Sequence, residues 1–352
     1  MKKEMIFNKK LFIQKKLISV DSPTFIIAEA GVNHGGDISI AKKLIDVAID
    51  SGADAVKFQA FNASDLILKN VEKAPYQKGT TDNKESQFEM LSALELSESQ
   101  NLELKSYCNQ NGIIFITTPF DEVSLENIQF LDLPAYKVSS TDLTNLLFLK
   151  KVAIKGKPIF LSTGMSYMSE VQMALEAIYP FNKDVVLLHC TANYPIKDIE
   201  VNLNVLNTYK ENFDILIGYS DHSVGVGAAP FAIPMGAKVV EKHFTLDKNS
   251  AGPDHLASLT PFELAEFVKQ IKTVDLYMGS YVKKPNLSEV ETRKSLQKSL
   301  VAMNNIKKDE KFTENNIVAK RTGGVGISPI YIKEVLGKNA TKNFLKDQII
   351  FL

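Results

Sequence analysis

Two histidines, His222 and His243, each stand at the end of a short apolar run of the sequence. The first run is Ile-Leu-Ile-Gly-Tyr-Ser-Asp-His over residues 215–222, and the second is Lys-Val-Val-Glu-Lys-His over residues 238–243. A Gly- and Ala-rich stretch of helical character separates them. Two successive strands would deliver both imidazoles to one rim of a parallel sheet, a geometry that suits a metal site with room left for a substrate.

The metal interpretation of this histidine pair competes with a simpler one, in which both side chains only complete the hydrogen bonding of the core. Two imidazoles on adjacent strand ends, flanked by Asp221 and Asp254, favour the metal. Such a set suits Mn²⁺, Co²⁺ or Zn²⁺, and the lack of a cysteine or third histidine ligand in these motifs argues against structural zinc.

Lysines and hydroxyls follow several other strand-like runs. Lys57, Lys137 and Thr118, together with several serines, form a set that supplies positive charge and directed hydrogen-bond donors, which is what a phosphate requires. Lys57 has a second interpretation as a Schiff-base lysine, because burial lowers the pKa of an amine. For either lysine taken alone, a structural ion pair is a third interpretation.

The elements that must position these residues form a repeat of short apolar strand and amphipathic helix. Eight strands are expected, at Phe25–Ala30, Ala55–Phe61, Ile113–Thr117, Ala135–Ser139, Pro158–Thr163, Val185–Cys190, Asp214–Tyr219 and Lys238–His243.

Eight alternating units predict a (β/α)₈ TIM barrel, in which polar residues at the carboxyl ends of strands are typical of catalysis. The runner-up, a doubly wound open sheet, would be expected to carry a Gly-rich dinucleotide turn, which the sequence lacks. The last helix of the repeat is expected to begin at the capping box Thr260-Pro261-Phe262-Glu263 and to end at Gly279.

The segment 62–96 is too long for a plain connection and shows little apolar periodicity. A long loop at the carboxyl face of a barrel is typical of a lid or a binding loop. A variable surface insertion is the alternative.

The composition narrows the class of protein. The 352 residues hold 41 Lys plus Arg and 41 Asp plus Glu, so the charge favours neither nucleic acid nor an anionic membrane as a partner. Cys108 and Cys190 cannot build a disulfide framework and are expected to be buried, reduced thiols of a cytoplasmic protein.

Charges interrupt the N-terminal segment through Lys16, so we expect no signal peptide. No apolar run of the sequence approaches the length of a membrane span.

The repeat sets the expected domains. Residues 1–280 are assigned to the barrel, with 1–23 as an N-terminal extension. A Lys-Lys-Pro-Asn run marks a linker over 281–298. Residues 299–352 form a small C-terminal domain that is too short for a generous core, so we expect it to dock on its own barrel or on a second subunit.

Several motifs together resemble the sialic acid (N-acylneuraminate) synthases and their nonulosonic-acid relatives, which include the legionaminic acid synthases. The tail, Lys-Arg-Thr-Gly-Gly-Val-Gly-Ile-Ser-Pro over 320–329, resembles the antifreeze-like (SAF, β-clip) domain of the same enzymes. The resemblance covers nearly the whole chain in order. Its barrel motifs are Ile-Ile-Ala-Glu-Ala-Gly-Val-Asn-His (26–34), Ala-Asp-Ala-Val-Lys-Phe-Gln (53–59), Thr-Thr-Pro-Phe (117–120), Leu-Ser-Thr-Gly-Met (161–165), Gly-Tyr-Ser-Asp-His-Ser (218–223), Glu-Lys-His-Phe-Thr-Leu-Asp-Lys (241–248) and Gly-Pro-Asp-His-Leu-Ala-Ser-Leu (252–259).

The resemblance implies a condensation. Phosphoenolpyruvate adds through C3 to the open-chain aldehyde of an N-acylated mannosamine-type sugar, water adds at C2, and phosphate leaves by C–O cleavage. We expect N-acetylmannosamine as the acceptor, which gives a sialic acid. The alternative acceptor is a 2,4-diacetamido-trideoxyhexose, which gives legionaminic or, less favoured by the Gly-Pro-Asp-His motif, pseudaminic acid. A remoter alternative is an inactive carbohydrate- or ice-binding relative, against which the intact histidines and lysines argue.

The resemblance also implies roles for individual residues. His222 and His243 would hold a divalent ion, Mn²⁺ above all with Mg²⁺ or Co²⁺ as alternatives, which polarises the aldehyde and helps to position the water. The residues that would hold phosphoenolpyruvate are Lys57, Thr118, Lys137, Ser140, Ser162 and Ser220. The residues that would contact the amino sugar are Glu29, Gln59, Tyr194, Asp254 and Arg321.

Glu29 and Asp142 complete the catalytic set with the two histidines. Arg321 would reach the sugar's N-acyl group from the antifreeze-like domain of a partner subunit, which implies a domain-swapped homodimer.

Some positions depart from the family pattern. On the fourth strand the family often has Lys-Ile-Gly-Ser-Gly-Glu or Lys-Ile-Pro-Ser-Gly-Glu where this chain has Lys-Val-Ser-Ser-Thr-Asp. Asp142 is therefore one methylene shorter than the usual glutamate and Thr141 replaces a glycine, which leaves proton transfer by Asp142 open. Thr322 replaces the proline that usually follows the arginine, and Ala192 stands where some members have an asparagine near the phosphate.

Overall fold

The computed structural model describes residues 5–78, 80–81 and 85–352. It divides into two compact units, Met1–Gly279 and Ser280–Leu352, each of which is described below by itself.

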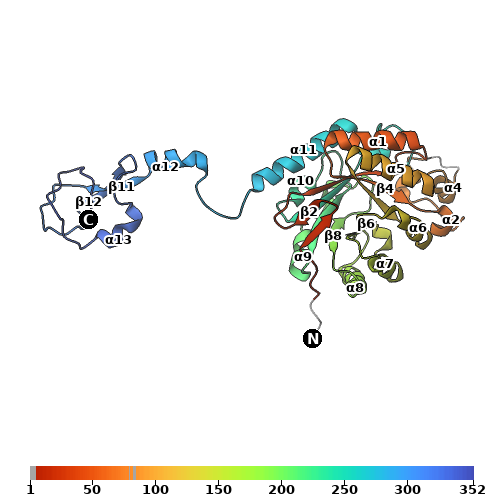
Figure 1. Cartoon of the computed structure of the whole chain (residues 1–352), viewed down its shortest axis with the longest axis horizontal. Coiled ribbons are helices and arrows are strands. Elements are labelled where there is room, and N and C mark those ends of the chain that lie inside the picture. Colours follow the sequence, from red (N-terminus) through yellow and green to blue (C-terminus); the bar gives the residue numbers. More distant parts are fainter. Residues whose placement is uncertain (1–4, 79, 82–84) are drawn as a thin grey trace. The chain divides into compact units, whose positions relative to one another are not determined.

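The larger unit is built on one eight-stranded parallel sheet around which the helices lie (Figure 1). Its strand order is β5-β4-β3-β10-β9-β8-β7-β6, so the last strand of the repeat pairs with the first. Ladder pairing joins seven neighbouring pairs of strands, and β5 and β6 approach each other to complete the ring. The strands are β3 (Phe25–Gly31), β4 (Ala55–Ala60), β5 (Ile114–Pro119), β6 (Tyr136–Val138), β7 (Ile159–Ser162), β8 (Val185–Cys190), β9 (Leu216–Asp221) and β10 (Ala237–His243).

This arrangement confirms the predicted (β/α)₈ barrel. Each of the eight expected strands is present, and the ends differ by at most two residues. The largest shift is at β9, expected from Asp214 and observed from Leu216. The shifted β9 reaches Asp221, so His222 directly follows the strand end.

The helices follow the strands in the expected alternation. The capping box at Thr260 is confirmed, because the Thr260 amide donates to Glu263 Oε2 and the Glu263 amide donates to Thr260 Oγ1 at the start of α11. The stop at Gly279 is confirmed as well, since Gly279 caps the end of that helix. The α-helices that accompany the eight strands are α1 (Ile38–Ser51), α5 (Glu98–Asn111), α6 (Glu122–Asn127), α7 (Leu146–Ile154), α8 (Met168–Ile178), α9 (Val205–Asn212), α10 (Ala229–Ala232) and α11 (Pro261–Met278), and the short 3₁₀ segments are η1 (Gln129–Leu131), η2 (Ser140–Asp142), η3 (Asp198–Glu200) and η4 (His255–Ala257).

Residues 10–19 of the expected N-terminal extension form a hairpin of β1 (Lys10–Ile13) and β2 (Lys16–Ser19). Leu11, Ile13 and Ile18 are buried in one cluster with the inward-facing residues at the starts of the barrel strands. The hairpin therefore closes the amino end of the barrel interior and leaves the carboxyl end for polar side chains.

The segment 62–96 is not the structureless loop that its weak periodicity suggested. It contains α2 (Ala63–Leu66), α3 (Pro75–Lys78) and α4 (Gln87–Ser92). Met90 and Leu94 pack with Val32 and Phe61 at the strand ends, an apolar anchor that local periodicity does not reveal. Residues 79 and 82–84 lie outside the described part of this segment.

The smaller unit has its own apolar core, which includes Leu300, Phe312 and Phe344. Part of the segment expected as a linker is helical, because α12 begins at Val290. The elements of this unit are η5 (Leu287–Glu289), α12 (Val290–Leu296), β11 (Lys298–Ala302), the antiparallel β12 (Ile317–Arg321), η6 (Pro329–Tyr331) and α13 (Ile332–Val335).

Within the described parts of both units, no helix has the length and apolar character needed to cross a membrane.

Candidate active site at the carboxyl ends of the strands

Side-chain alternation along the barrel strands gathers polar groups at the carboxyl end of the interior. Glu241 and His243 lie two residues apart on β10 and share its inner face, and Ser220 and His222 do the same on and just beyond β9. The amino-terminal halves of these strands contribute apolar residues such as Leu216 and Val239 to the interior. The inner faces of β9 and β10 therefore change from apolar to polar in the direction of the rim.

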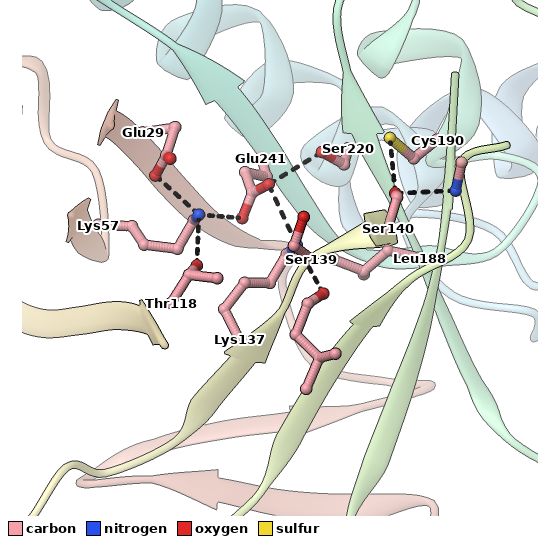
Figure 2. Close-up of polar contacts among 12 residues, drawn as sticks. Glu29, Lys57, Thr118, Lys137, Ser139, Ser140, Leu188, Cys190, Ser220 and Glu241 are labelled. Carbon is pink, nitrogen blue, oxygen red and sulfur yellow. Dashed lines mark hydrogen bonds and ion pairs between the residues drawn. The ribbon is translucent and has the colours of Figure 1, made fainter. Parts of the chain in front are cut away.

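Four buried charged side chains come together from different strands (Figure 2). This charged array consists of Glu29 from β3, Lys57 from β4, Lys137 from β6 and Glu241 from β10. Lys57 Nζ lies 2.9 Å from Glu29 Oε2 and 3.7 Å from Glu241 Oε2. Lys137 Nζ lies 3.7 Å from Glu241 Oε1 and also donates to the Val138 carbonyl at 3.1 Å. Glu241 thus stands between the two ammonium groups.

The charged array shifts the pKa values of its two carboxyl groups in opposite directions. Burial raises the pKa of Glu29 to about 7, although Lys57 opposes this shift and Glu241 adds to it. Burial would also raise the pKa of Glu241, but Lys137, Lys57 and the Ser220 hydrogen bond lower it to about 2. The negative charge therefore resides on Glu241, and Glu29 exchanges a proton near neutral pH.

Both lysines are buried, but their environments differ. Burial works against the charge of Lys57, yet Glu241 and Glu29 outweigh this and raise its pKa. For Lys137, burial prevails over the attraction of Glu241 and lowers the pKa. A Schiff-base lysine needs a lowered pKa, so the raised pKa of Lys57 favours the anion-holding interpretation over the covalent one.

Hydroxyl groups surround the array. Lys57 Nζ donates to Thr118 Oγ1 at 3.0 Å, and Ser220 Oγ donates to Glu241 Oε1 at 2.9 Å. Ser162 Oγ is buried and has no hydrogen-bond partner among the described residues. A buried hydroxyl without a partner is costly, so a ligand oxygen at this position would satisfy it.

Ser140 lies beside the array at the start of η2. It accepts a hydrogen bond from the Gly164 amide at 2.8 Å and donates to Cys190 Sγ at 3.6 Å. Cys190 Sγ is also 3.8 Å from His222 Nδ1. Burial alone would lower the pKa of His222, but Cys190 and the Thr191 carbonyl raise it. Cys190 is a free, buried thiol as expected, and it lies within the site rather than in the apolar core.

The two histidines lie next to each other as the sequence predicted, with ring centroids 5.4 Å apart. Tyr194 completes an aromatic group with them, since its ring centroid lies 4.1 Å from that of His222 and 5.4 Å from that of His243.

The histidine pair fits a divalent ion. His222 Nδ1 donates to the Thr191 carbonyl at 2.7 Å, which fixes the ring and leaves Nε2 as the nitrogen that would bind an ion in the neutral imidazole. His243 Nδ1 is buried without a hydrogen-bond partner, and burial together with His222 lowers the pKa of His243 well below its usual value. Among the described residues no group of three or more His, Cys, Asp or Glu side chains is arranged to hold a metal.

The residues expected to contact the sugar lie close to the histidines and to Glu29. Gln59 Nε2 donates to Glu29 Oε1 at 3.3 Å. Asp254 Oδ2 lies 4.0 Å from His243 Nδ1, and burial raises the pKa of Asp254 to about 6 against the opposing effects of His222 and Lys57.

Asp142 lies in η2, next to the strand that carries Lys137. Burial raises its pKa to about 6, with a hydrogen bond from Thr141 opposing the shift and Asp121 adding to it. Arg321 belongs to the smaller unit, where it is the last residue of β12 and is exposed.

One residue of the site, Glu241, was missed from the sequence. The available signal was its spacing, because it precedes His243 by two residues and therefore shares the inner face of the same strand. Asp221 was wrongly expected to flank the histidines. It faces away from the barrel interior and pairs with Lys242, because adjacent residues of a strand point to opposite faces.

Comparisons with known proteins place the chain among enzymes of this architecture. Residues 44–283 match the model of the NeuB family. The chain is 46% identical to the N,N'-diacetyllegionaminic acid synthase of Campylobacter jejuni over 93% of its own length and 98% of that protein. It is 41% identical to the N,N'-diacetyllegionaminic acid synthase of Legionella pneumophila over 91% of each chain. Among solved structures, it resembles the N-acetylneuraminic acid synthetase of Leptospira borgpetersenii crystallised with citrate, with a TM-score of 0.72 and 33% identity over 83% of this chain and 98% of that one.

Proposed function

Because the chain belongs to the NeuB family, whose relatives named above are nonulosonic acid synthases, we propose that it condenses phosphoenolpyruvate with the open-chain aldehyde of an N-acylated amino sugar. C3 of phosphoenolpyruvate forms a bond to the aldehyde carbon, whose oxygen takes a proton. Water adds at C2, and the bond from C2 to the phosphate oxygen breaks, so inorganic phosphate leaves. The products are a nonulosonic acid and phosphate.

The favoured acceptor is a 2,4-diacetamido-2,4,6-trideoxyhexose, and the favoured product is N,N'-diacetyllegionaminic acid. The chain is more similar to the two legionaminic acid synthases, at 46% and 41% identity, than to the N-acetylneuraminic acid synthetase, at 33%. This preference replaces the sequence-based expectation of N-acetylmannosamine, which remains the second candidate.

The observation that carries this proposal is the charged array beside the histidine pair. Two buried lysines, Lys57 and Lys137, lie on the same inner face of the barrel as Glu241, which precedes His243 by two residues. The two lysines of the array supply positive charge for the phosphate and carboxylate of phosphoenolpyruvate. The histidine pair at the rim beyond it is placed to act on the aldehyde carbonyl of the sugar. The two halves of the reaction would thus meet at one end of the barrel.

The chain's own residues divide the work as follows. Lys57 and Lys137 bind the anionic groups of phosphoenolpyruvate, and the unpartnered Ser162 hydroxyl donates to one of their oxygens. Thr118, Ser140 and Ser220 orient the same substrate. Glu29, with its pKa near 7, exchanges a proton at the sugar oxygen.

His222 and His243 would hold the divalent ion, which supplies Lewis-acid polarisation of the aldehyde. Tyr194, packed against both imidazoles, shapes the space in which the sugar chain lies. Gln59, beside Glu29, and Asp254, beside His243, offer hydrogen bonds to the sugar.

The smaller unit is proposed to be an antifreeze-like domain that completes the site of a partner subunit. It holds 14 Lys plus Arg against 7 Asp plus Glu, whereas the barrel unit holds 27 against 34, so their net charges are +7 and −7. Opposite net charges favour docking of one unit on another. Thr322, in the place of the usual proline, donates to the Val325 carbonyl and accepts from Ser299 Oγ, which holds the turn after Arg321 without a proline ring.

The test of the proposed reaction is phosphate release from phosphoenolpyruvate in the presence of Mn²⁺, with each candidate sugar offered separately. Phosphoenolpyruvate labelled with ¹⁸O in the bridging oxygen adds the bond assignment, because C–O cleavage delivers that label to phosphate. We expect phosphate release with the 2,4-diacetamido sugar at a kcat/KM at least about tenfold above that with N-acetylmannosamine. A higher kcat/KM with N-acetylmannosamine would reverse the choice of sugar. Retention of the label in the sugar acid would contradict C–O cleavage, and no release with any acceptor would support the inactive relative.

A further inference from the structure

A buried ion pair lies directly behind the two histidines. Asp221 and Lys242 precede His222 and His243, and they are opposite each other in the parallel pairing of β9 with β10. The side chains of this pair are 0% and 1% exposed, and Lys242 Nζ lies 3.1 Å from Asp221 Oδ2. Because side chains alternate, the pair faces the outer layer of the barrel while the imidazoles face the interior.

The pair also fixes the backbone on both sides of His222. Asp221 Oδ1 accepts hydrogen bonds from the amide and the hydroxyl of Ser223, at 2.9 and 2.5 Å. Lys242 Nζ donates to the Ser223 carbonyl. Asp221 Oδ2 in addition accepts from the amides of Ala228 and Ala229, at 3.2 and 3.1 Å. The segment that leaves β9 is thereby folded back against Lys242.

The space around the pair is closed. Gly227 has a φ of +67°, and a Cβ added there would lie 2.1 Å from Ser223 Oγ, 2.8 Å from Asp221 Oδ2 and 2.9 Å from Lys242 Nζ. No side chain therefore fits at residue 227, and the ammonium and carboxylate remain in contact without intervening groups.

The ladder between β9 and β10 ends directly before the two histidines. Its last pair is Lys242 with Asp221, so His222 and His243 do not face each other in that ladder. The backbone of His243 instead pairs with Glu29 of β3, and the His222 carbonyl accepts from the Ile196 amide. The contact between Asp221 and Lys242 is therefore the side-chain link between β9 and β10 nearest to the imidazoles.

We propose that Asp221 and Lys242 form a positioning pair that sets the spacing of the His222 and His243 imidazoles and thereby the affinity and geometry of the divalent-ion site. This inference rests on the metal role proposed above for the two histidines. Both side chains of the pair face away from the interior in which the histidines would hold the ion. Their opposite charges cancel, so the pair orders the strand ends without placing a net charge beside the cation.

The experiment measures ion binding to the full-length protein without substrates. Mn²⁺ affinity is determined by the electron paramagnetic resonance signal of free Mn²⁺, and coordination geometry by the visible absorption bands of bound Co²⁺. For Lys242→Met and Asp221→Asn we expect Mn²⁺ affinity to fall by roughly 10- to 100-fold, the range found when residues that orient metal ligands are replaced, with altered Co²⁺ bands.

A matched control is Asp275→Asn. Asp275 accepts from the Thr24 amide at 2.7 Å and from its hydroxyl at 2.8 Å, just before β3 begins at the other end of the barrel. It should lower thermal stability without changing Mn²⁺ affinity or the Co²⁺ bands. If Lys242→Met and Asp221→Asn do not fold, Ser223→Ala tests the same contacts, because its hydroxyl touches both charged groups, and a smaller weakening of several-fold is expected.

The outcomes separate this inference from the one on which it rests. Unchanged Mn²⁺ affinity and unchanged Co²⁺ bands in the folded variants would overturn the positioning pair while the metal site stands. If His222→Ala does not weaken Mn²⁺ binding, the proposed metal site fails and the positioning pair fails with it.

Discussion

The carboxylate of Glu29 lies 2.9 Å from the ammonium of Lys57, and both side chains are buried. An ion pair at this distance normally lowers the pKa of a carboxyl group, yet the pKa of Glu29 is raised to about 7. Burial and the competing carboxylate of Glu241 outweigh the attraction of one lysine, because Lys57 is shared between two acids. Glu29 is thus set to take up a proton when more negative charge arrives.

We therefore predict that phosphoenolpyruvate binding is linked to proton uptake. At pH 7 Glu29 is about half protonated, and an anion beside Lys57 raises its pKa further, so up to about half a proton enters the protein. Titration calorimetry in buffers of different ionisation enthalpy should give a binding enthalpy that rises with the ionisation enthalpy of the buffer. Glu29→Gln should remove this dependence, and an equal dependence in the variant would assign the proton to another group.

Replacing either lysine of the charged array should damage the use of phosphoenolpyruvate more than that of the sugar. Each lysine provides a charge-assisted contact of about 1.5–3 kcal/mol, so Lys57→Ala and Lys137→Ala should lower kcat/KM for phosphoenolpyruvate by roughly 10- to 150-fold. Steady-state kinetics with each substrate varied in turn gives the measurement.

Lys155→Ala, which removes a surface pair with Glu126, is the control and should leave both parameters unchanged. A rise confined to the sugar KM in Lys57→Ala would contradict the assignment. Borohydride trapping of a substrate adduct on Lys57 would restore the Schiff-base interpretation.

Removal of the divalent ion should abolish turnover, and Mn²⁺ should restore it. The reason is the histidine pair, in which His222 is oriented by the Thr191 carbonyl and His243 carries an unpartnered buried nitrogen. His222→Ala and His243→Ala should lose bound Mn²⁺ and activity together while circular dichroism remains that of the folded protein. Full turnover in a sample verified to be free of metal would refute this prediction.

Asp142→Asn should stabilise the protein in a pH-dependent way. The pKa of Asp142 is raised from 3.8 to about 6 in the folded state, so the folded protein holds the proton more tightly than the unfolded chain. Its contribution to stability is present in full below pH 4 and is lost as the pH rises to 6. The variant lacks this loss, so its unfolding free energy should exceed that of the unmodified protein by about 1–3 kcal/mol at pH 7 and by little at pH 4.

Denaturant titrations at both pH values measure this difference. A stabilisation that is the same at pH 4 and pH 7 would show that Asp142 does not titrate in this window. Activity of the same variant with both substrates separates a role in proton transfer from a purely structural one.

Mixing two inactive variants tests whether Arg321 serves a partner's site. If each site uses Arg321 from the partner subunit, a mixed dimer of Arg321→Ala and His222→Ala has one site with both defects and one site with neither. Mixing should then recover up to roughly a quarter of the activity if subunits exchange statistically. Subunit exchange is verified by mass spectrometry of differently labelled chains, and exchange without recovery would mean that Arg321 acts within its own chain or not at all.

The sequence by itself determined the barrel and most of the side chains at its rim. Strand formation depends on local runs of β-branched and apolar residues, and helix ends depend on local caps such as the Thr260 box. Both can therefore be predicted from a single sequence. Alternation then predicts that His222 and His243 share a face, and the structure brings them together.

Tertiary structure decided which charges meet. Glu241 looked like one more polar residue of a strand end, and only the closure of the barrel brings it between lysines of β4 and β6, far away in the sequence. Asp221 was expected to flank the histidine pair, but it pairs with Lys242 and accepts a hydrogen bond from the Ala229 amide of α10. Such pairings depend on distances across the barrel and on burial. A buried charge needs a partner of opposite charge, and only the folded structure determines which residue lies close enough to be that partner.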